Sequence, residues 1–195
     1  DLDEYMSAVG RDLFTQGLRE TLQQFEDADN FGSLIVPKLT NITGVLAELE
    51  TKNLGSNLFL ADTHSKVLKV LLMAEALSPR YAVVVANPPY MGGKGMNGRL
   101  GACAKKNYPK SKSDLFAMFI ERNLDMAASR GTVAMITMQS WMFLSSFEAL
   151  RGRILNQHTI LSMAHLGARA FDSIGGEVVS TTAYVLDIAH KPHSQ

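Results

Sequence analysis

The sequence predicts an α/β fold in which a mixed sheet carries helices on both faces and is preceded by a mostly helical segment, residues 1–79. Three observations support this prediction. Residues 81–86 are a continuous, valine-rich apolar run, typical of a parallel strand buried on both faces. Segments of helical period alternate with further apolar runs, such as residues 132–138. The hydrophobic content, 46% of 195 residues, is enough to build a core.

The first 79 residues are expected to fold as helices. Apolar residues recur at helical spacing through residues 1–29. A second helix is expected over roughly 41–52, and a third begins with Asp62 or Thr63 as its N-cap. We interpret all of these helices as packing scaffold.

Residues 80–190 are expected to form an alternating half-sheet, followed by a short tail, residues 191–195. After the first strand of this region, Ser113 is expected to cap a helix that runs to about Ser129. The apolar run at 132–138 then follows as a second buried strand. Together these elements make a strand, helix, strand unit.

The C-terminal part of this region is expected to add one helix and two strands. Ser145 and Glu148 have the spacing of a capping box for a helix that ends near residue 157. Strands are expected over residues 159–166 and 178–188. The gap between these two strands is too short for a helical crossover, so they are predicted to be antiparallel neighbours.

The composition excludes several classes of protein. Basic and acidic residues number 19 each, so any surface that binds nucleic acid must be local. The single cysteine, Cys103, excludes a disulfide framework and a multi-cysteine zinc site, and is typical of a reducing cytoplasm. No apolar run approaches the roughly 18 residues needed to span a bilayer, and the acidic start is unlike a signal peptide. We therefore expect a cytoplasmic protein without a membrane partner.

The clearest chemical signal is Asn87-Pro88-Pro89-Tyr90, directly after the first predicted strand of the sheet. Open α/β sheets bind ligands at the carboxyl ends of their strands. The amine of adenine is a poor nucleophile because its lone pair is delocalised into the ring. The Asn87 side-chain oxygen and the Pro88 carbonyl are expected to accept its two N–H groups, and Tyr90 would offer a face on which an extruded base stacks. The alternative is that these four residues only end a strand.

This motif is similar to the catalytic motif of amino-methyltransferases that use S-adenosylmethionine. The surrounding residues narrow the resemblance to the PglX family, the adenine-specific DNA methyltransferases of BREX phage-defence systems. The matching stretches are residues 91–94, 112–116, 140–145, 165–167 and 175–178. The resemblance implies the C-terminal half of a Rossmann-like S-adenosylmethionine-dependent methyltransferase domain, which would methylate a flipped adenine of double-stranded host DNA at N6.

The resemblance also implies roles for two residues outside the motif. Phe171 matches the aromatic residue that stacks on the flipped adenine opposite Tyr90, and a simple core phenylalanine is the alternative. Asp114 matches an acid that helps to shape the cofactor pocket, whereas its own position favours a helix first-turn acid. Other phage-defence proteins, or an inhibitor encoded by a phage, are the partners that the resemblance implies besides DNA.

The sequence departs from this family at the cofactor site. Such enzymes bind S-adenosylmethionine through a glycine-rich turn after their first strand, and no such turn is visible before Tyr81. Asp62 is the one candidate for an acid on the cofactor side, and helix capping explains it equally. We therefore expect the cofactor half before residue 1, and expect the present residues to be inactive by themselves.

Residues 91–113 contain no acidic side chain and six basic ones, Lys94, Arg99, Lys105, Lys106, Lys110 and Lys112. Five glycines accompany them, so the segment is expected to be a flexible loop that closes over the DNA backbone. A solvated loop without a function is the alternative. We favour a function because the catalytic motif is its neighbour.

Two further chemistries are not expected. The five histidines lack the spacing of metal ligands. Cys103 does not follow a proline as in carbon-5 cytosine methyltransferases, so transfer without a covalent intermediate is implied. Two other functions stay open: methylation of another planar amine (cytosine N4, a guanine amine in RNA or a protein glutamine amide), and binding of DNA or a partner without activity. Titration with S-adenosylmethionine separates the binding function from the enzymes.

Overall fold

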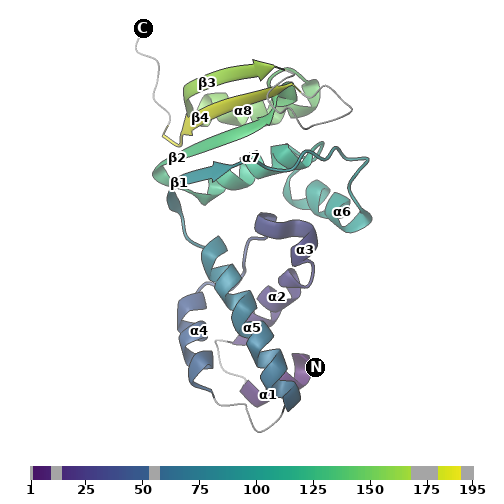
Figure 1. Cartoon of the computed structure of the whole chain (residues 1–195), viewed down its shortest axis with the longest axis vertical. Helices are drawn as coiled ribbons and strands as arrows, with labels where there is room; N and C mark the ends of the chain where they lie inside the picture. Colours follow the sequence, from purple (N-terminus) through teal and green to yellow (C-terminus); the bar gives the residue numbers. More distant parts are fainter. Residues whose placement is uncertain (1, 10–14, 53–57, 168–179, 190–195) are drawn as a thin grey trace. The chain divides into compact units, whose positions relative to one another are not determined.

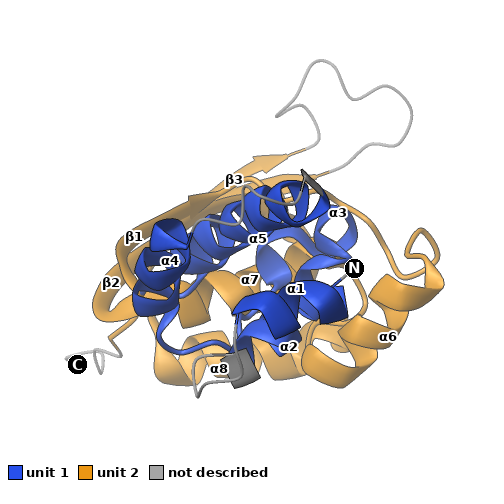
Figure 2. Ribbon diagram, turned by 90° about the horizontal axis from the view of Figure 1, so that it is seen from below, with its two compact units in different colours: residues 1–79 blue, residues 80–195 orange. Residues whose placement is uncertain are grey.

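The structure is a computed structural model, and it describes residues 2–9, 15–52, 58–167 and 180–189. The chain divides into two compact units, residues 1–79 and residues 80–195, which Figure 2 colours separately. Each unit has a hydrophobic core of its own. Within the described ranges, no helix has both the length and the apolar composition needed to cross a membrane.

The described part of the first unit is helical. Its elements are α1 (Leu2–Val9), α2 (Thr15–Phe25), α3 (Ala28–Phe31), the 3-10 turn η1 (Gly32–Leu34), α4 (Ile42–Thr51) and α5 (Leu58–Leu77). The helical pattern predicted over residues 1–29 is therefore divided among three helices. Gly32 ends α3 with a φ of 51°, a backbone conformation that glycine adopts without the steric cost of a Cβ atom.

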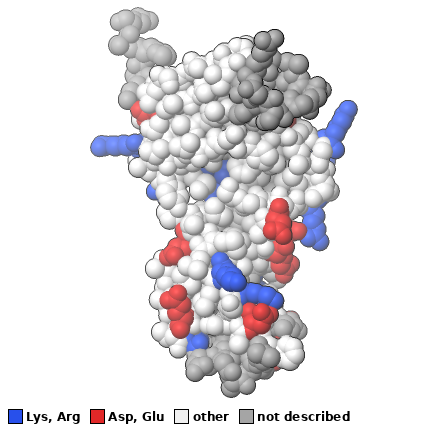
Figure 3. Space-filling view, in the orientation of Figure 1, with Lys and Arg blue, Asp and Glu red and all other residues white. Residues whose placement is uncertain are grey.

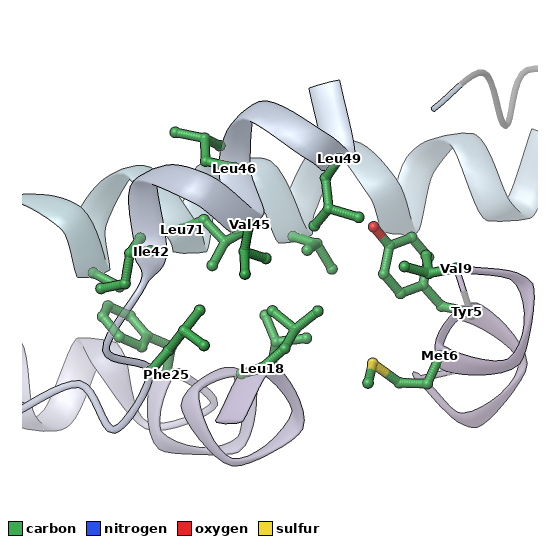
Figure 4. Packing of buried hydrophobic residues seen from close by; sticks show 14 of the residues in the cluster. Tyr5, Met6, Val9, Leu18, Phe25, Ile42, Val45, Leu46, Leu49 and Leu71 are labelled. Atoms are coloured by element: carbon green, nitrogen blue, oxygen red, sulfur yellow. The ribbon is translucent and has the colours of Figure 1, made fainter. Parts of the chain in front are cut away.

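The core of the first unit lies between α1, α2, α4 and α5. Figure 4 shows Leu18 and Phe25 of α2 pointing toward Ile42 and Val45 of α4, and all four are buried. The hydroxyl of Tyr5 lies 2.8 Å from Nδ1 of the His64 ring, a hydrogen bond that joins α1 to α5. These helices thus bury a common apolar surface, as their sequence spacing predicts.

The predicted beginnings of two helices in this unit have different outcomes. α4 begins at Ile42, one residue after its predicted start, and Asn41 is its N-cap, whose side chain accepts a hydrogen bond from the Gly44 backbone N–H at 3.2 Å. The predicted cap of α5 at Asp62 or Thr63 is wrong, because α5 already begins at Leu58. The residues before Asp62 are leucine, phenylalanine and alanine, most of them good helix formers, so the helix extends through them.

The second unit contains a four-stranded mixed sheet. The strands are β1 (Tyr81–Ala86), β2 (Ala127–Met138), β3 (Thr159–Gly167) and β4 (Thr181–Asp187). Figure 1 shows them in the order β1-β2-β4-β3. β1 is parallel to β2, while β4 is antiparallel to both β2 and β3. The predicted α/β class and the antiparallel pairing of the last two strands are confirmed.

The helices and short turns of the second unit connect these strands. They are α6 (Gly98–Asn107), α7 (Leu115–Met126), the 3-10 turns η2 (Gln139–Met142) and η3 (Ser145–Phe147), and α8 (Glu148–Gln157). Phe116 of α7 and Leu150 of α8 belong to one buried cluster with Val133 of β2 and Leu186 of β4. Both helices therefore cover the same face of the sheet. Helices predicted for the other face have no counterpart in the described ranges.

The prediction that β1 is covered on both faces is wrong for the described residues. Val83 and Val85 are 61% and 74% exposed, whereas Val84 and Ala86 pack against the core. The reason is topological: β1 lies at the edge of the sheet, where it pairs only with β2, and α7 packs on one of its faces. The apolar run therefore predicted the strand correctly, but the prediction that a second layer covers its other face was wrong for the described residues.

The other boundaries differ by a few residues. β2 begins at Ala127, five positions before the predicted Thr132, because Gly131 permits an irregular pairing with the start of β1. The capping box at Ser145 and Glu148 is also wrong. Glu148 is the first residue of α8, and the buried Phe147 occupies the N-cap position without a side-chain cap. The predicted end of α8 near residue 157 is confirmed.

Gly131 provides a test of the β1–β2 pairing. A Cβ atom there would lie 2.9 Å from the carbonyl oxygens of Tyr81 and Ala128, which are backbone atoms that cannot rotate away. Replacing Gly131 by Ala should lower the free energy of unfolding of the second unit by about 1–3 kcal/mol. Fluorescence of Trp141, the single tryptophan and part of this unit's core, would follow unfolding in urea.

Gly152 of α8 is the matched control, since a Cβ atom there meets nothing within 4 Å. Replacing Gly152 by Ala should leave the unit as stable or raise its stability by about 0.5–1 kcal/mol, because alanine favours a helix. Equal unfolding midpoints for the Gly131 variant and the wild type would contradict the close backbone approach.

Candidate active site

The motif leaves the sheet at the carboxyl end of β1. Ala86, the last residue of that strand, is paired in register with Met135 of the parallel strand β2. The two parallel strands run toward the same end of the sheet, and this register places Asn87 beside Ile136, near the end of β2. This end is where open α/β sheets bind ligands.

The four motif residues differ in exposure. Asn87 and Pro89 are exposed, Pro88 is buried and Tyr90 is half-buried. Asn87 also lines a hollow of about 450 Å³ on the open face of the sheet, together with Val85, Ile136 and Val185. The amide of Asn87 is therefore accessible to a ligand, while the buried Pro88 anchors the chain behind it.

Tyr90 packs against the core of the second unit. Its ring meets the ring of Phe116 edge-on, with the centroids 6.1 Å apart and the planes at 83°. Burial raises the pKa of the Tyr90 hydroxyl above its usual range, so it stays a neutral phenol near pH 7. That hydroxyl is buried, with no hydrogen-bond partner among the described residues. Packing therefore limits how far the ring can turn.

The chain after the motif is held by the beginning of α7. The Asp114 carboxylate accepts hydrogen bonds from the backbone N–H groups of Met91 at 3.1 Å and Phe116 at 3.3 Å. The Leu115 N–H donates to the Met91 carbonyl at 3.0 Å, and the Gly93 N–H donates to the Ser113 carbonyl at 3.0 Å. A short antiparallel contact thus joins the segment after Tyr90 to the start of α7.

Asp114, and not Ser113, is the N-cap of α7. It has extended backbone dihedrals, so it precedes the first turn in which the sequence had placed it. Burial raises the pKa of its carboxyl, while the N–H donors of Met91, Phe116 and Leu115 oppose that rise. The sequence could identify an acid at this helix end but not its second partner, 23 residues away.

Residues 91–113, the basic segment, contain a helix. The flexible loop expected there is therefore wrong for residues 98–107. α6 occupies residues 98–107, and the Asn97 side chain caps it by accepting from the Leu100 N–H at 2.9 Å. Leu100 and Ala104 are buried and fix one side of the helix. Gly98 and Gly101 weaken the helical propensity without preventing the helix, because the cap and the buried side chains oppose that effect.

All six basic residues of this segment are exposed, and three of them lie on α6: Arg99, Lys105 and Lys106. Figure 3, in the orientation of Figure 1, shows lysine and arginine side chains projecting on both sides of the second unit, including the side where α6 lies. Lys105 and Lys106 occupy the last turn, where positive charge complements the helix dipole. Half of the predicted basic residues therefore lie on a helix, while Lys94, Lys110 and Lys112 lie in the turns before and after it.

A buried ionic cluster anchors the end of the basic segment. The Ser111 hydroxyl donates to the carboxylate of Glu121 on α7. Nη1 of Arg153 on α8 lies 3.4 Å from the same carboxylate, and Nη2 lies 2.6 Å from Asp125. Burial raises the pKa of the neighbouring Tyr108 hydroxyl to about 12, so it also stays neutral. No sequence motif indicated this cluster, because its members are distant in the chain.

The turn after β2 leaves the sheet at the same end as the motif. Trp141 is buried there, whereas Phe143 and Leu144 are 69% and 52% exposed. The Arg151 guanidinium of α8 donates to the carbonyls of Trp141 at 2.9 Å and Leu144 at 2.5 Å. These two hydrogen bonds fix the turn, while the side chains of Phe143 and Leu144 remain exposed.

Two candidates from the sequence are not joined to this site by the described residues. Phe171 lies outside the described ranges, so its stacking role stays a prediction. Asp62 lies in α5 of the first unit, where its carboxylate pairs with Lys66 at 2.7 Å. The structure does bring together the motif, Asp114 and the beginning of the basic segment.

Comparison with known proteins identifies relatives of this chain. Residues 15–171 match the family described as Eco57I restriction-modification methylase. The chain is 45% identical to the adenine-specific methyltransferase BrxX of Escherichia coli O9:H4 (strain HS), over 92% of this chain and 16% of that protein. It is 42% identical to the adenine-specific methyltransferase PglX of Lacticaseibacillus casei (strain Zhang), over 91% of this chain and 15% of that protein. The chain thus spans about a sixth of the length of these relatives.

Among solved structures, the chain is similar to a Listeria monocytogenes protein described as a putative class I S-adenosylmethionine-dependent methyltransferase, with a TM-score of 0.47 and 15% identity. The superposition covers 95% of this chain and 66% of that one. The resemblance to PglX that the sequence predicts is confirmed by the curated relatives.

The buried ionic cluster gives a testable prediction. The side chains of Glu121 and Arg153 are 10% and 17% exposed, so replacing Arg153 by Met leaves a largely buried carboxylate without its cation. The free energy of unfolding of the second unit should fall by about 3–5 kcal/mol. Urea unfolding followed by Trp141 fluorescence measures this change.

Replacing the exposed Arg130 of β2 by Met is the control for that experiment and should change the stability by less than about 0.5 kcal/mol. Replacing Glu121 by Gln together with Arg153 by Met should recover part of the loss, because the buried charge is removed along with its partner. A single Arg153 variant as stable as the Arg130 control would contradict the buried pair.

Proposed function

The chain belongs to the family of Eco57I restriction-modification methylases, and on that premise we propose that it carries the catalytic motif of a DNA methyltransferase acting on the N6 amine of adenine. The observation that supports this proposal most directly is the exposed Asn87 of an Asn-Pro-Pro-Tyr motif at the carboxyl end of β1. The names of the BrxX and PglX relatives, both adenine-specific methyltransferases, support adenine over other amines.

The proposed chemistry depends on two neutral acceptors. The Asn87 side-chain oxygen and the Pro88 carbonyl each accept one N–H of the amine, which moves electron density onto its nitrogen. S-adenosylmethionine, when bound, supplies an electrophilic methyl group. With the donor present, the amine nitrogen would gain that methyl group and lose one of its protons to solvent. The product is N6-methyladenine.

The described residues assign no binding site to the methyl donor. No strand with a glycine-rich turn precedes β1 in the described ranges. The proposal therefore places the residues that hold the donor in other parts of a longer protein, as the length of the relatives allows. The residues of this chain would bind the amine and contact the base.

Tyr90 would support the extruded base. A base flipped out of the duplex loses its stacking partners, and stacking on an aromatic ring returns roughly 1–3 kcal/mol per base. Because Tyr90 packs edge-on against Phe116, the rotation of its ring is limited before the base arrives. Phe171 would cover the opposite face of the base, as the resemblance to PglX implies.

Phosphate binding is assigned to the basic segment. Lys94, Arg99, Lys105, Lys106, Lys110 and Lys112 would contact the DNA backbone beside the motif. The segment continues directly from the Asp114-bound stretch after Tyr90, which supports this assignment for its first residues. By the same resemblance, the biological role would be the marking of host DNA in a phage-defence system.

Asn87 provides the direct test of the chemistry. Replacing Asn87 by Ala in the full-length protein should lower the rate of N6-methyladenine formation by at least about a hundredfold, because a fixed acceptor at the reacting group is lost. Binding of duplex DNA should change little, since this side chain acts on one amine. Mass spectrometry of digested DNA and a gel-shift assay measure the two quantities.

Asn156, an exposed asparagine of α8, is the control, and its replacement by Ala should leave the rate nearly unchanged. Methylation at the wild-type rate in the Asn87 variant would exclude the assigned role. Transfer to cytosine in place of adenine would favour the alternative amine substrate.

The basic segment gives a second prediction. Replacing Lys105 and Lys106 by Gln removes two exposed charges from the last turn of α6. If both contact phosphates, the slope of log affinity against log salt should flatten by about 1.8, at roughly 0.9 per contact. The preference for a specific over a scrambled duplex should stay the same, because phosphate contacts carry no sequence information.

Replacing Lys66 and Lys69 of α5 by Gln changes the net charge equally and serves as the control for a general electrostatic effect. Its slope should stay near the wild-type value. Equal flattening in both double variants would mean that net charge, and not a defined contact at α6, controls binding.

A further inference from the structure

The beginning of α7 contacts the catalytic motif from two sides. Asp114 and Leu115 bind the backbone of Met91, the residue that follows the motif. Phe116 meets the ring of Tyr90, the last residue of the motif. Three consecutive residues of one helix start therefore fix the position at which the motif ends.

The motif is thereby held at both of its ends. On the other side, Asn87 continues directly from Ala86, whose pairing with Met135 fixes the end of β1. Between the two ends lie Pro88 and Pro89, whose rings lock φ and leave few free dihedrals. With both ends fixed and the middle stiff, the direction of the Asn87 amide and of the Pro88 carbonyl follows from the two anchors.

Asp114 is the part of the second anchor that a side chain supplies. One of its carboxylate oxygens, Oδ1, accepts from both Met91 and Phe116, so a single atom joins the motif to the helix. The turn that precedes Asp114 is also fixed. The Asp114 N–H donates to the Ser111 carbonyl at 3.3 Å, and the Ser111 hydroxyl donates to Glu121. Asp114 is half-buried, which limits competition from water for these N–H groups.

We propose that Asp114 is a positioning residue, which holds the backbone after Tyr90 so that the acceptors at Asn87 and Pro88 meet the target amine in a reactive geometry. This inference rests on the proposed methyl transfer and adds a residue that does not itself touch the base. It separates two tasks of the same carboxylate: capping α7 through Phe116, and holding the motif through Met91.

Three replacements of Asp114 in the full-length protein distinguish these tasks. Asn keeps an oxygen at the position of Oδ1 and should preserve both hydrogen bonds. Ser remains a good N-cap but is one bond shorter, so it should cap α7 and release Met91. Ala removes both contacts. Asn41→Ala, which removes the cap of α4 in the first unit, is the control for the loss of a cap alone.

The expected result is a fall in kcat by about tenfold to a hundredfold in both Asp114→Ala and Asp114→Ser, because small misplacement of reacting groups costs rates of this order. The KM for DNA and for S-adenosylmethionine should change little. Asp114→Asn should restore the rate to within a few-fold of wild type. Asn41→Ala should leave kcat unchanged. Melting temperatures of Asp114→Ser and the wild type should agree, which excludes unfolding as the cause.

A second readout does not depend on catalysis. Hydrogen exchange of the amides at residues 91–93, followed by mass spectrometry, should accelerate in Asp114→Ser and Asp114→Ala and stay slow in Asp114→Asn. If the wild-type protein transfers no methyl group to adenine, the proposed function fails, while the exchange rates still decide whether Asp114 holds this segment.

Three results would overturn the inference. The first is an unchanged kcat in Asp114→Ser, which would show that holding Met91 does not matter for the rate. The second is an equal loss of kcat in Asn41→Ala, which would reduce the effect to stability. The third is exchange at residues 91–93 that is as slow in Asp114→Ala as in the wild type, which would show that other contacts hold the motif.

Discussion

The parallel pairing of β1 with β2 is the constraint on which the rest of the second unit depends. Because Ala86 lies opposite Met135, the motif after β1 and the turn after β2 leave the sheet at the same end, where these two parallel strands have their carboxyl ends. The connection between two parallel strands must cross back along the sheet, and α7 provides that crossover. Its N-terminal end consequently returns to the edge at which β1 ends, which is how Asp114 comes to lie beside Met91. The strand, helix, strand order thus produces both the site and its support.

Charge inside this unit is used to fix segments that the sheet does not reach. Glu121 and Arg153 are largely buried and satisfy one another, and Glu121 also binds Ser111. Taking such charges from water is costly unless each finds a partner, so α7 and α8, which carry them, can pack together in few arrangements. The basic segment enters α7 through Ser111 and is therefore fixed at its C-terminal end, while its lysines remain exposed. A segment that is fixed at one end and carries exposed lysines can bind the phosphates of a DNA backbone.

Much of this arrangement could be predicted from the sequence, and the failures have physical reasons. The bounds of β1 were predictable because six apolar residues in a row stand between a proline and the motif. The antiparallel pairing of β3 and β4 followed from the short gap between them. The start of β2 was not predictable, because residues 127–131 pair through an irregular register that only Gly131 permits. Asp114 as the partner of Met91, and Ser111 as the partner of Glu121, are contacts between distant residues, which periodicity does not encode.

The identity of the residues at the site fits a division of tasks between charged and neutral groups. A carboxylate is a stronger acceptor than an amide, yet the acid nearest the motif in the described hydrogen-bond network, Asp114, uses its oxygen on two backbone N–H groups. The exposed acceptors are the neutral oxygens of Asn87 and Pro88. Neutral acceptors gain their effect only when they are oriented in advance, because they lack the charge that would draw a donor into place. Asp114 would therefore act by fixing the backbone after the motif. The resulting orientation of the Asn87 and Pro88 oxygens would give them their proposed effect on the amine.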